Sequence, residues 1–168
     1  MNPSSHYMHI NNPNHVFIIA EAGSNWKVGN YFDDLNRAKK LITVAAKCGA
    51  DAIKFQTYNA KDVYVINAGR SKYLSKSGTK KSITEIFDEY SMPYKMLKTL
   101  NKFCKQKNII FMSTPFSIMD AKEVDKYVEI HKLASYEINH IPLLQFLAKT
   151  KKPIHVSKEV ADIMIGVL

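Results

Sequence analysis

Short β-branched and aromatic runs alternate with amphipathic helical segments along most of this chain. Right-handed parallel βαβ units are the common solution for such a pattern, either as a barrel or as a doubly wound sheet, and the pattern alone leaves both open. Asp33 or Asp34 is expected to cap the first helix and Gly49 to end it. The expected strands are 16–21, 51–56, 108–114, 129–135 and 152–157; the expected helices are 34–48, 83–90, 93–107, 117–127 and 141–150; a long loop is expected at 57–82.

Length and composition bound the class of protein. The 168 residues allow a sizeable core but fall short of the roughly 250 of a complete (β/α)₈ barrel. The chain is 46% hydrophobic and 23% charged, as in globular proteins. It has no apolar run near the roughly 20 residues of a membrane span and no signal-peptide pattern at its start. We therefore expect a cytoplasmic protein without a membrane partner.

The chain carries a net charge of +9, from 24 Lys and Arg against 15 Asp and Glu. This charge suits nucleic acid, an anionic surface or small anionic substrates. The lysines are scattered, without the interleaved aromatic residues that stack on bases, so no nucleic-acid partner is expected. Cys48 and Cys104 have neither CxxC nor zinc spacing and are interpreted as structural thiols.

Polar side chains recur where each predicted strand ends. In parallel α/β folds the ligand site lies at the carboxyl ends of the strands, so these side chains are expected to form one site. The members are Glu21; Lys54 and Gln56; Ser113 and Thr114; Lys132, Ser135 and Glu137; and Ser157.

Lys54 stands out because it lies in an apolar strand. Side chains alternate along a strand, so Lys54 points inward if Ile53 and Phe55 pack against helices. An ammonium group there needs an anion. Lys132 repeats the arrangement, and two inward lysines suit a ligand with two or three negative charges. The alternative is internal pairing, of Lys54 with Glu21 or of Lys132 with Glu137.

Other chemical signals are weaker. The sequence has no GxGxxG or GxxxxGK[ST] motif and no HExxH spacing, and no Ser/His/Asp order can be assembled. His131 and His155 are interpreted as core residues. A basic loop is interpreted either as a solvated segment or as a lid over an anionic substrate; it contains Arg70, Lys72, Lys76, Lys80 and Lys81.

Several of these stretches resemble the amino-terminal half of the sialic acid synthase (N-acetylneuraminate synthase) family, with its legionaminate, pseudaminate and spore-coat polysaccharide relatives. The matching pieces are FIIAEAGSNW, AAKCGADAIKFQTY, SITEIFDEYSMPY, FMSTPFS and HKLASYEINHIPLLQFLAKTKKPI, over about residues 15–157. The resemblance implies part of a TIM (β/α)₈ barrel, about the first five strands.

The family condenses phosphoenolpyruvate with an N-acylated amino sugar, typically N-acetylmannosamine, to a nonulosonic acid and phosphate. The resemblance also implies a divalent metal, Mn²⁺ or Mg²⁺, and a homodimer in the complete enzyme. Carried over by motif, Lys54, Thr114, Lys132 and Ser135 are expected on the phosphoenolpyruvate side. The catalytic candidates are Glu21 and Glu137: Glu21 is expected near the sugar, and Glu137 is expected to contact the sugar or to transfer a proton. Gln56 and Ser157 complete the substrate-binding candidates.

The resemblance ends after Ser157, where the family's STGM motif is replaced by SKEVADIMIGVL. We divide the chain into a lead-in at 1–15, a partial synthase barrel at 16–157 and a divergent end at 158–168. The family's metal-ligating histidines and its carboxy-terminal domain have no counterpart in this sequence. The interpretation is a truncated or frameshifted member, or one piece of a split protein, that is inactive alone. Two alternatives are a noncatalytic half-barrel that binds an anionic ligand or acts as a scaffold, and a nucleic-acid binder driven by charge.

Overall fold

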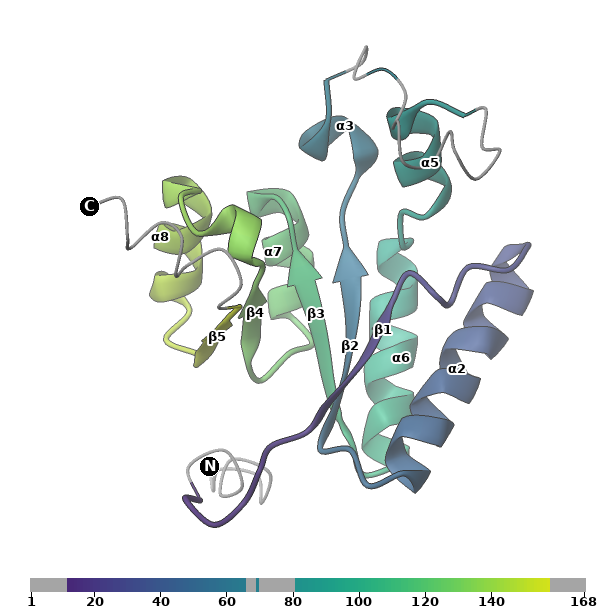
Figure 1. Ribbon diagram of the computed structural model, residues 1–168, viewed down its shortest axis with the longest axis vertical. Coiled ribbons are helices and arrows are strands. Elements are labelled where there is room, and N and C mark those ends of the chain that lie inside the picture. The colour runs from purple at the N-terminus through teal and green to yellow at the C-terminus, as the bar shows by residue number, and fades with distance from the viewer. Residues whose placement is uncertain (1–11, 66–68, 70–80, 158–168) are drawn as a thin grey trace.

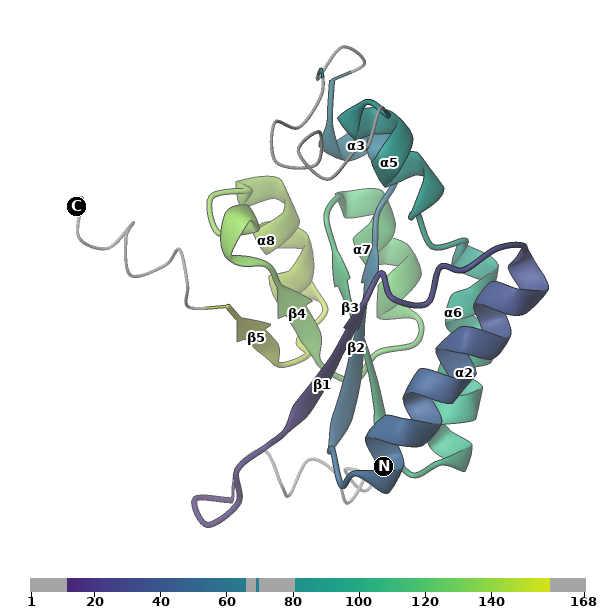
Figure 2. The ribbon, with the colours of Figure 1, turned by 45° about the vertical axis from the view of Figure 1, so that its right-hand side comes forward.

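The structure is a computed structural model that describes residues 12–65, 69 and 81–157. Strands β1 (Ile19–Gly23), β2 (Ala52–Thr57) and β3 (Ile110–Pro115) form a parallel sheet in that order. Strands β4 (His131–Leu133) and β5 (Ile154–Val156) form a second parallel pair. Because β3 contacts β4, the two sheets lie side by side (Figures 1 and 2). The predicted alternation of parallel strands and helices is confirmed.

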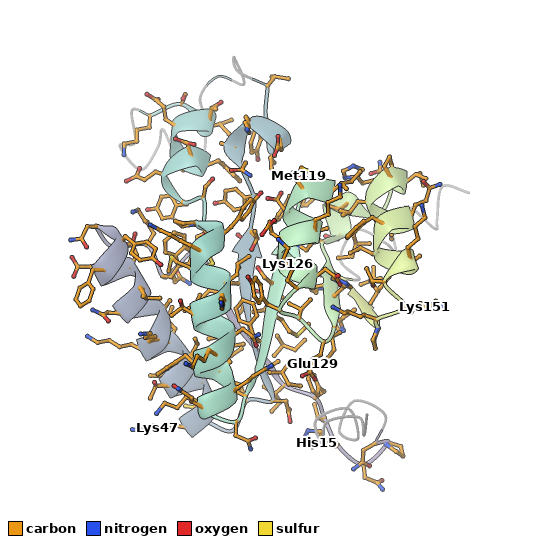
Figure 3. All side chains as sticks on the ribbon, turned by 180° about the vertical axis from the view of Figure 1, so that it is seen from behind. His15, Lys47, Met119, Lys126, Glu129 and Lys151 are labelled. Carbon is orange, nitrogen blue, oxygen red and sulfur yellow. The ribbon has the colours of Figure 1, made fainter. Side chains whose placement is uncertain are left out.

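Helices cover one face of the strands and also stand beyond one end of them. Seen from behind, the covering helices succeed one another as α2 (Tyr31–Lys47), α6 (Tyr94–Gln106), α7 (Ile118–Asp125) and α8 (Ile141–Lys149) (Figure 3). Two shorter helices, α3 (Ala60–Val63) and α5 (Ile83–Glu89), lie beyond the carboxyl end of β2 (Figure 1). Each covering helix follows one strand and precedes the next, as βαβ units require.

Several predicted boundaries are wrong. The first strand begins at Ile19 rather than residue 16, because the Asp51 carboxylate holds the backbone N–H of Ile18 (2.7 Å) just before it. The first helix begins at Tyr31, because the side chain of Asn30 caps it. The fourth strand ends at Leu133, and Ser135–Glu137 form a 3₁₀ turn, η1. Helix α3 lies inside the segment predicted as loop.

Asp34 was predicted as a possible cap but has another task. Its carboxylate accepts hydrogen bonds from the backbone N–H groups of Val28 and Gly29 (2.8 and 2.9 Å). It also forms an ion pair with Lys27 (2.7 Å). Burial raises the pKa of Asp34, but these contacts outweigh it and leave the pKa below its usual value. Asp34 therefore fixes the turn that leads from β1 into α2.

The core has an outer and an inner part. On the outer face, Ile53 and Phe55 of β2 and Phe111 of β3 pack against α2 and α6. On the inner face, Ala52, Ile110, Met112 and Ile130 form a smaller apolar cluster. A third cluster under α7 and α8 contains Ala121, Leu133, Leu143 and Leu147. The predicted alternation of Ile53 and Phe55 with an inward Lys54 is confirmed.

Three covering helices return to the sheet through the same kind of turn. The second residue after each helix has a left-handed backbone: Gly49 (φ 81°) after α2, Asn108 (φ 53°) after α6 and Lys151 (φ 59°) after α8. After α2 and α6, the backbone N–H of this left-handed residue and that of the next residue donate to carbonyls of the last helical turn, as in a Schellman motif. Gly49 ends the first helix as predicted.

The two cysteines are free thiols. Cys104 is buried in α6, and burial raises its pKa to about 12, so it stays protonated and inert. Cys48 is the exposed residue that follows α2. The interpretation of Cys104 as a structural thiol is confirmed.

Candidate active site

The inner face of the sheet carries two buried lysines near the carboxyl ends of β2 and β4. Lys54 is 8% exposed and Lys132 is 7% exposed. Each continues an apolar inner face: Ala52 precedes Lys54 on β2, and Ile130, the residue just before β4, precedes Lys132. Charged lysines are seldom this buried without a function or a partner.

Lys54 has two contacts on neighbouring strands. It forms an ion pair with Glu21, the residue opposite it in the β1–β2 register. It also donates to the hydroxyl of Thr114 on β3 at 3.4 Å. The internal pairing of Lys54 with Glu21, which was the alternative to a bound anion, is thus present. Because the Glu21 side chain is 54% exposed, the pair opens to solvent on that side.

A third basic group joins the two lysines. His155 stands opposite Lys132 in the β4–β5 register. Its pKa is lowered, first by burial and then by the charges of Lys132 and Lys54. The prediction that His155 is a core residue is wrong, because the residue keeps contact with solvent and is only partly buried. The alternation of Ile154, which packs under α8, with His155 was the signal that could have placed it on the inner face.

The remaining site candidates lie at the same ends of the strands. The hydroxyl of Ser24 donates to Gln56 at 3.4 Å, and Thr114 is 3% exposed. Ser135 is buried in η1, and the backbone N–H of Ser157 donates to the Leu133 carbonyl at 3.1 Å. The predicted site residues therefore come from all five strands or the turns directly after them.

Glu137 has a partner within its own turn. Its carboxylate lies 2.9 Å from Nδ1 of His140. Glu137, which was suggested as an internal partner of Lys132, thus contacts a histidine. An imidazole at this distance can exchange a proton with the carboxylate.

Ser113 does not belong to the site. It lies on the outer face of β3, where its hydroxyl is 2.7 Å from that of Thr57, and both are buried. Its prediction as a strand-end site residue is wrong, because it shares a face with Phe111 rather than with Thr114.

Sequence reasoning missed a polar network just outside this site. The buried carboxylate of Asp120 accepts hydrogen bonds from the hydroxyls of Tyr94 (2.7 Å) and Ser117 (2.6 Å), and Asn59 contacts both Tyr94 and Asp120. Burial raises the pKa of Asp120, and burial together with the Asp120 contact raises that of Tyr94. The network ties the residue before α3 to the starts of α6 and α7.

Of the basic loop, only Lys81 lies in the described residues, where it is exposed and pairs with Glu89 at 2.5 Å. The other loop lysines, Arg70 and the divergent end at 158–168 lie outside them. In the described ranges, no helix combines the length and the apolar character that a membrane span requires. The same ranges contain no group of three His, Cys, Asp or Glu side chains placed to hold a metal ion. The cytoplasmic location and the homodimer stay predictions.

The model of the NeuB family matches residues 41–164, more than half of the chain. The chain is 37% identical to the spore coat polysaccharide biosynthesis protein SpsE of Bacillus subtilis, over 88% of this chain and 38% of that protein. It is 36% identical to the N,N'-diacetyllegionaminic acid synthase of Campylobacter jejuni, over 88% of this chain and 43% of that protein. The chain belongs to the NeuB family.

A solved structure gives the fold of this family member. The N-acetylneuraminic acid (sialic acid) synthetase of Leptospira borgpetersenii, determined in complex with citrate, is 33% identical and superposes with a TM-score of 0.70. The match covers 88% of this chain and 45% of the other. The predicted resemblance and the part of a TIM barrel are therefore confirmed. The chain spans about two fifths of the length of the curated relatives that it matches.

The histidine at the start of β4 leads to a stability prediction. His131 is fully buried, and its Nε2 lies 3.1 Å from Asp125, which also pairs with Lys152. Burial lowers the pKa of His131 despite Asp125. Near pH 6.5 the unfolded chain thus binds a proton that the folded chain resists, so the free energy of unfolding falls as the pH drops below about 6.5.

Urea unfolding at pH 7.5 and pH 5.5 measures this loss. His131→Gln is expected to reduce the difference between the two pH values, and His155→Gln to remove a further part, because the pKa of His155 is also lowered. Asp125 does not contribute to the difference between these two pH values. Its pKa is lowered, so its titration changes the free energy of unfolding only below the ordinary pKa of 3.8. An unchanged pH difference in both variants would contradict the assignment.

Proposed function

We propose that this chain is the phosphoenolpyruvate-binding part of a nonulosonic acid synthase that serves the biosynthesis of a sialic acid-like sugar for cell-surface polysaccharide. The observation that carries this proposal is the pair of buried lysines, Lys54 and Lys132, on one inner face. Membership of a family that includes legionaminic and pseudaminic acid synthases supports it.

Phosphoenolpyruvate suits this face because it carries a phosphate at one end and a carboxylate at the other. Two ammonium groups provide for both charges, and the Thr114 hydroxyl beside Lys54 supplies a further donor. Ser135, Ser157 and Gln56 are the polar candidates around the ligand. Binding requires the ligand anion to compete with Glu21 for Lys54, which the exposure of Glu21 makes feasible.

The amino sugar is assigned to the side of Glu21 and Glu137. In the proposed reaction, C3 of the enol attacks the aldehyde carbon and forms the C–C bond, while a water oxygen adds at C2. The C2–O bond to phosphate then breaks, and phosphate leaves. Addition of water at C2 releases one proton, which the alkoxide formed from the aldehyde takes up. The C2 hydroxyl gives its remaining proton to the departing phosphate as the C2–O bond breaks and the ketone forms. Glu137, held by His140, and Glu21 are the carboxyl groups available for these transfers.

The lysines act by electrostatics. Charge that develops on the departing phosphate is stabilised by ammonium groups already in place. The resemblance implies a divalent metal, which would supply polarisation of the sugar aldehyde. The described residues do not form a set that would hold it.

Isothermal titration with phosphoenolpyruvate, phosphate and pyruvate tests the proposal. Phosphoenolpyruvate is expected to bind at least about tenfold more tightly than either partial ligand, because each charged end adds a charge-assisted contact. Equal affinity for all three would contradict the assignment. Sugar-dependent phosphate release with Mn²⁺ is expected to be absent for the 168-residue polypeptide alone, because the described residues supply only strands β1 to β5 and no group placed to hold the metal. Robust turnover would refute this.

The Lys54–Glu21 pair favours a second candidate, a noncatalytic half-barrel that binds an anion. An internal counterion is also what a structural lysine would have. The two candidates differ in sugar dependence. A binding protein takes up the anion but releases no phosphate under any condition, including in the presence of the rest of a family barrel.

A further inference from the structure

His155 adds an imidazole to the face that carries the two buried lysines. It stands directly opposite Lys132 in the parallel register of β4 and β5. Its neighbour Ile154 packs against the apolar cluster under α7 and α8, so His155 lies on the other, inner face of β5. The imidazole is therefore placed beside one of the two ammonium groups that form the candidate site.

The surroundings of His155 are apolar on one side and cationic on the other. The ring helps to line a cavity of about 250 Å³ whose other lining side chains are all apolar, among them Phe17, Ile19, Met112 and Ile130. Of the described residues, the charged groups that act on the ring are Lys132 on β4 and Lys54 on β2. Glu21 on β1 reaches this side through its ion pair with Lys54.

These surroundings keep the imidazole largely neutral at pH 7 when no ligand is bound. Burial lowers the pKa of His155 most, and the charges of Lys132 and Lys54 lower it further. An anion bound between the same ammonium groups would offset their effect on the ring, because opposite charge favours the protonated form. The protonation of His155 and the binding of an anion at the lysines are therefore coupled.

Phosphoenolpyruvate brings more negative charge to this face than the two lysines can balance. A phosphate ester carries a charge of about −1.5 to −2 near pH 7, and the carboxylate adds one more. The charge of Lys54 is already matched by Glu21. A third cation on this face would lower the cost of holding the ligand there.

We propose that His155 is a third cationic residue of the anion site, which takes up one proton when a phosphate-bearing carboxylate binds at Lys54 and Lys132. The proton comes from solvent, with which the residue keeps contact, and returns there when the ligand leaves. The inference rests on the proposed binding of phosphoenolpyruvate, and it adds a residue and a proton to that binding step.

The proton NMR signal of the imidazole ring reports the protonation of His155 directly, and its absence from the spectrum of His155→Gln identifies it. Lys132→Met is expected to raise the pKa of His155, because it removes the facing charge. Sulfate and phosphoenolpyruvate are each expected to raise it in the unsubstituted chain. Sulfate is a useful probe because it keeps two negative charges throughout the titration.

Isothermal titration at pH 8.0 and pH 6.0 measures the consequence for affinity. Between these values, the ratio of the phosphoenolpyruvate dissociation constants of His155→Gln and the unsubstituted chain is expected to grow by about three- to tenfold, because protonation and binding are linked. Comparing the two proteins at the same pH cancels the titration of the ligand's own phosphate, whose pKa is about 6.

His15→Gln is the matched control for His155→Gln. His15 lies beyond the amino ends of the strands, where its Nε2 is 2.8 Å from the Asp51 carboxylate (Figure 3). The same chemical change at that distance from the site is expected to leave the ratio of dissociation constants unchanged at both pH values. Circular dichroism establishes that each variant is folded.

The outcomes separate this inference from the proposed function. If phosphoenolpyruvate binds more tightly than phosphate but leaves the pKa of His155 unmoved, the role of His155 is overturned and the proposed function stands. A loss of affinity in His155→Gln that is equal at pH 8.0 and pH 6.0 would show contact by a neutral imidazole, which also overturns the proton uptake.

The converse result is equally distinct. If sulfate raises the pKa of His155 while phosphoenolpyruvate binds no more tightly than phosphate, the coupling of His155 to an anion is supported and the proposed ligand is overturned. A chain that is folded and binds none of sulfate, phosphate and phosphoenolpyruvate would overturn both.

Discussion

Lys54→Met and Lys132→Met are each expected to weaken phosphoenolpyruvate binding by about 10- to 100-fold, and the double variant to abolish it. Each change removes one charge-assisted contact, a loss of roughly 1.5–3 kcal/mol. Methionine keeps the length and apolar body of the side chain, so the inner face stays packed. Isothermal titration of the folded variants gives the dissociation constants.

Lys47→Met is the matched control for these variants. Lys47 is an exposed lysine at the end of α2 (Figure 3). Its loss removes the same formal charge at the opposite end of the strands, so binding is expected to change less than about twofold if contact rather than net charge matters. An equal loss in all three variants would show that only the overall positive field attracts the ligand.

Glu21→Gln distinguishes a ligand role of Lys54 from a purely internal one. If Lys54 serves only to neutralise Glu21, removing the carboxylate leaves an uncompensated buried charge and lowers stability without improving binding. If Lys54 binds the ligand, Glu21→Gln removes a competitor, and phosphoenolpyruvate binding is expected to strengthen. The direction of the change in affinity therefore separates the two roles.

Phe55→Ala is expected to lower the free energy of unfolding by about 3–5 kcal/mol, the usual cost of removing a buried aromatic ring. Phe55 is fully buried between the sheet and the covering helices, and its ring centroid lies 6.0 Å from that of Phe111. Because total stabilities are commonly about 5–15 kcal/mol, this single change removes a large share. Urea unfolding monitored by circular dichroism measures it.

Phe32→Ala makes the same chemical change on the surface. Phe32 is 70% exposed at the start of α2, so the expected loss is within about 0.5 kcal/mol. Similar losses in the two variants would contradict the assignment of Phe55 to the core. A small loss in both would mean that the outer face does not carry the stability of the fold.

The features that follow from the alternation of side chains along a strand were predicted best. Alternation along β2 correctly separated Ile53 and Phe55 from Lys54, because neighbouring strand residues must face opposite sides. The same rule, applied along β3 and β5, would have removed Ser113 from the site and added His155. Those two errors arose because polar residues near a strand end were grouped together without asking which face of the sheet each side chain occupies.

Other features could not be predicted because distant side chains create them. The start of β1 depends on Asp51, which lies 33 residues beyond the Ile18 amide that it binds. The Asp120 network joins side chains 26 and 61 residues apart, and only its contact between Ser117 and Asp120 is local in the sequence. The Asn30 cap was missed because two aspartates nearby looked equally suitable.

The three left-handed turns after α2, α6 and α8 lie at the ends of the helices that lead back into the strands, opposite the ends that carry Lys54 and Lys132. The fold thus assigns different tasks to its two rims: one sets how each strand enters the sheet, and the other holds the chemistry. Lys151 is a non-glycine residue with a left-handed backbone. It belongs to the first rim (Figure 3). Sequence variation in those turns can adjust stability without altering ligand recognition, and variation on the opposite rim can change specificity on an unaltered frame.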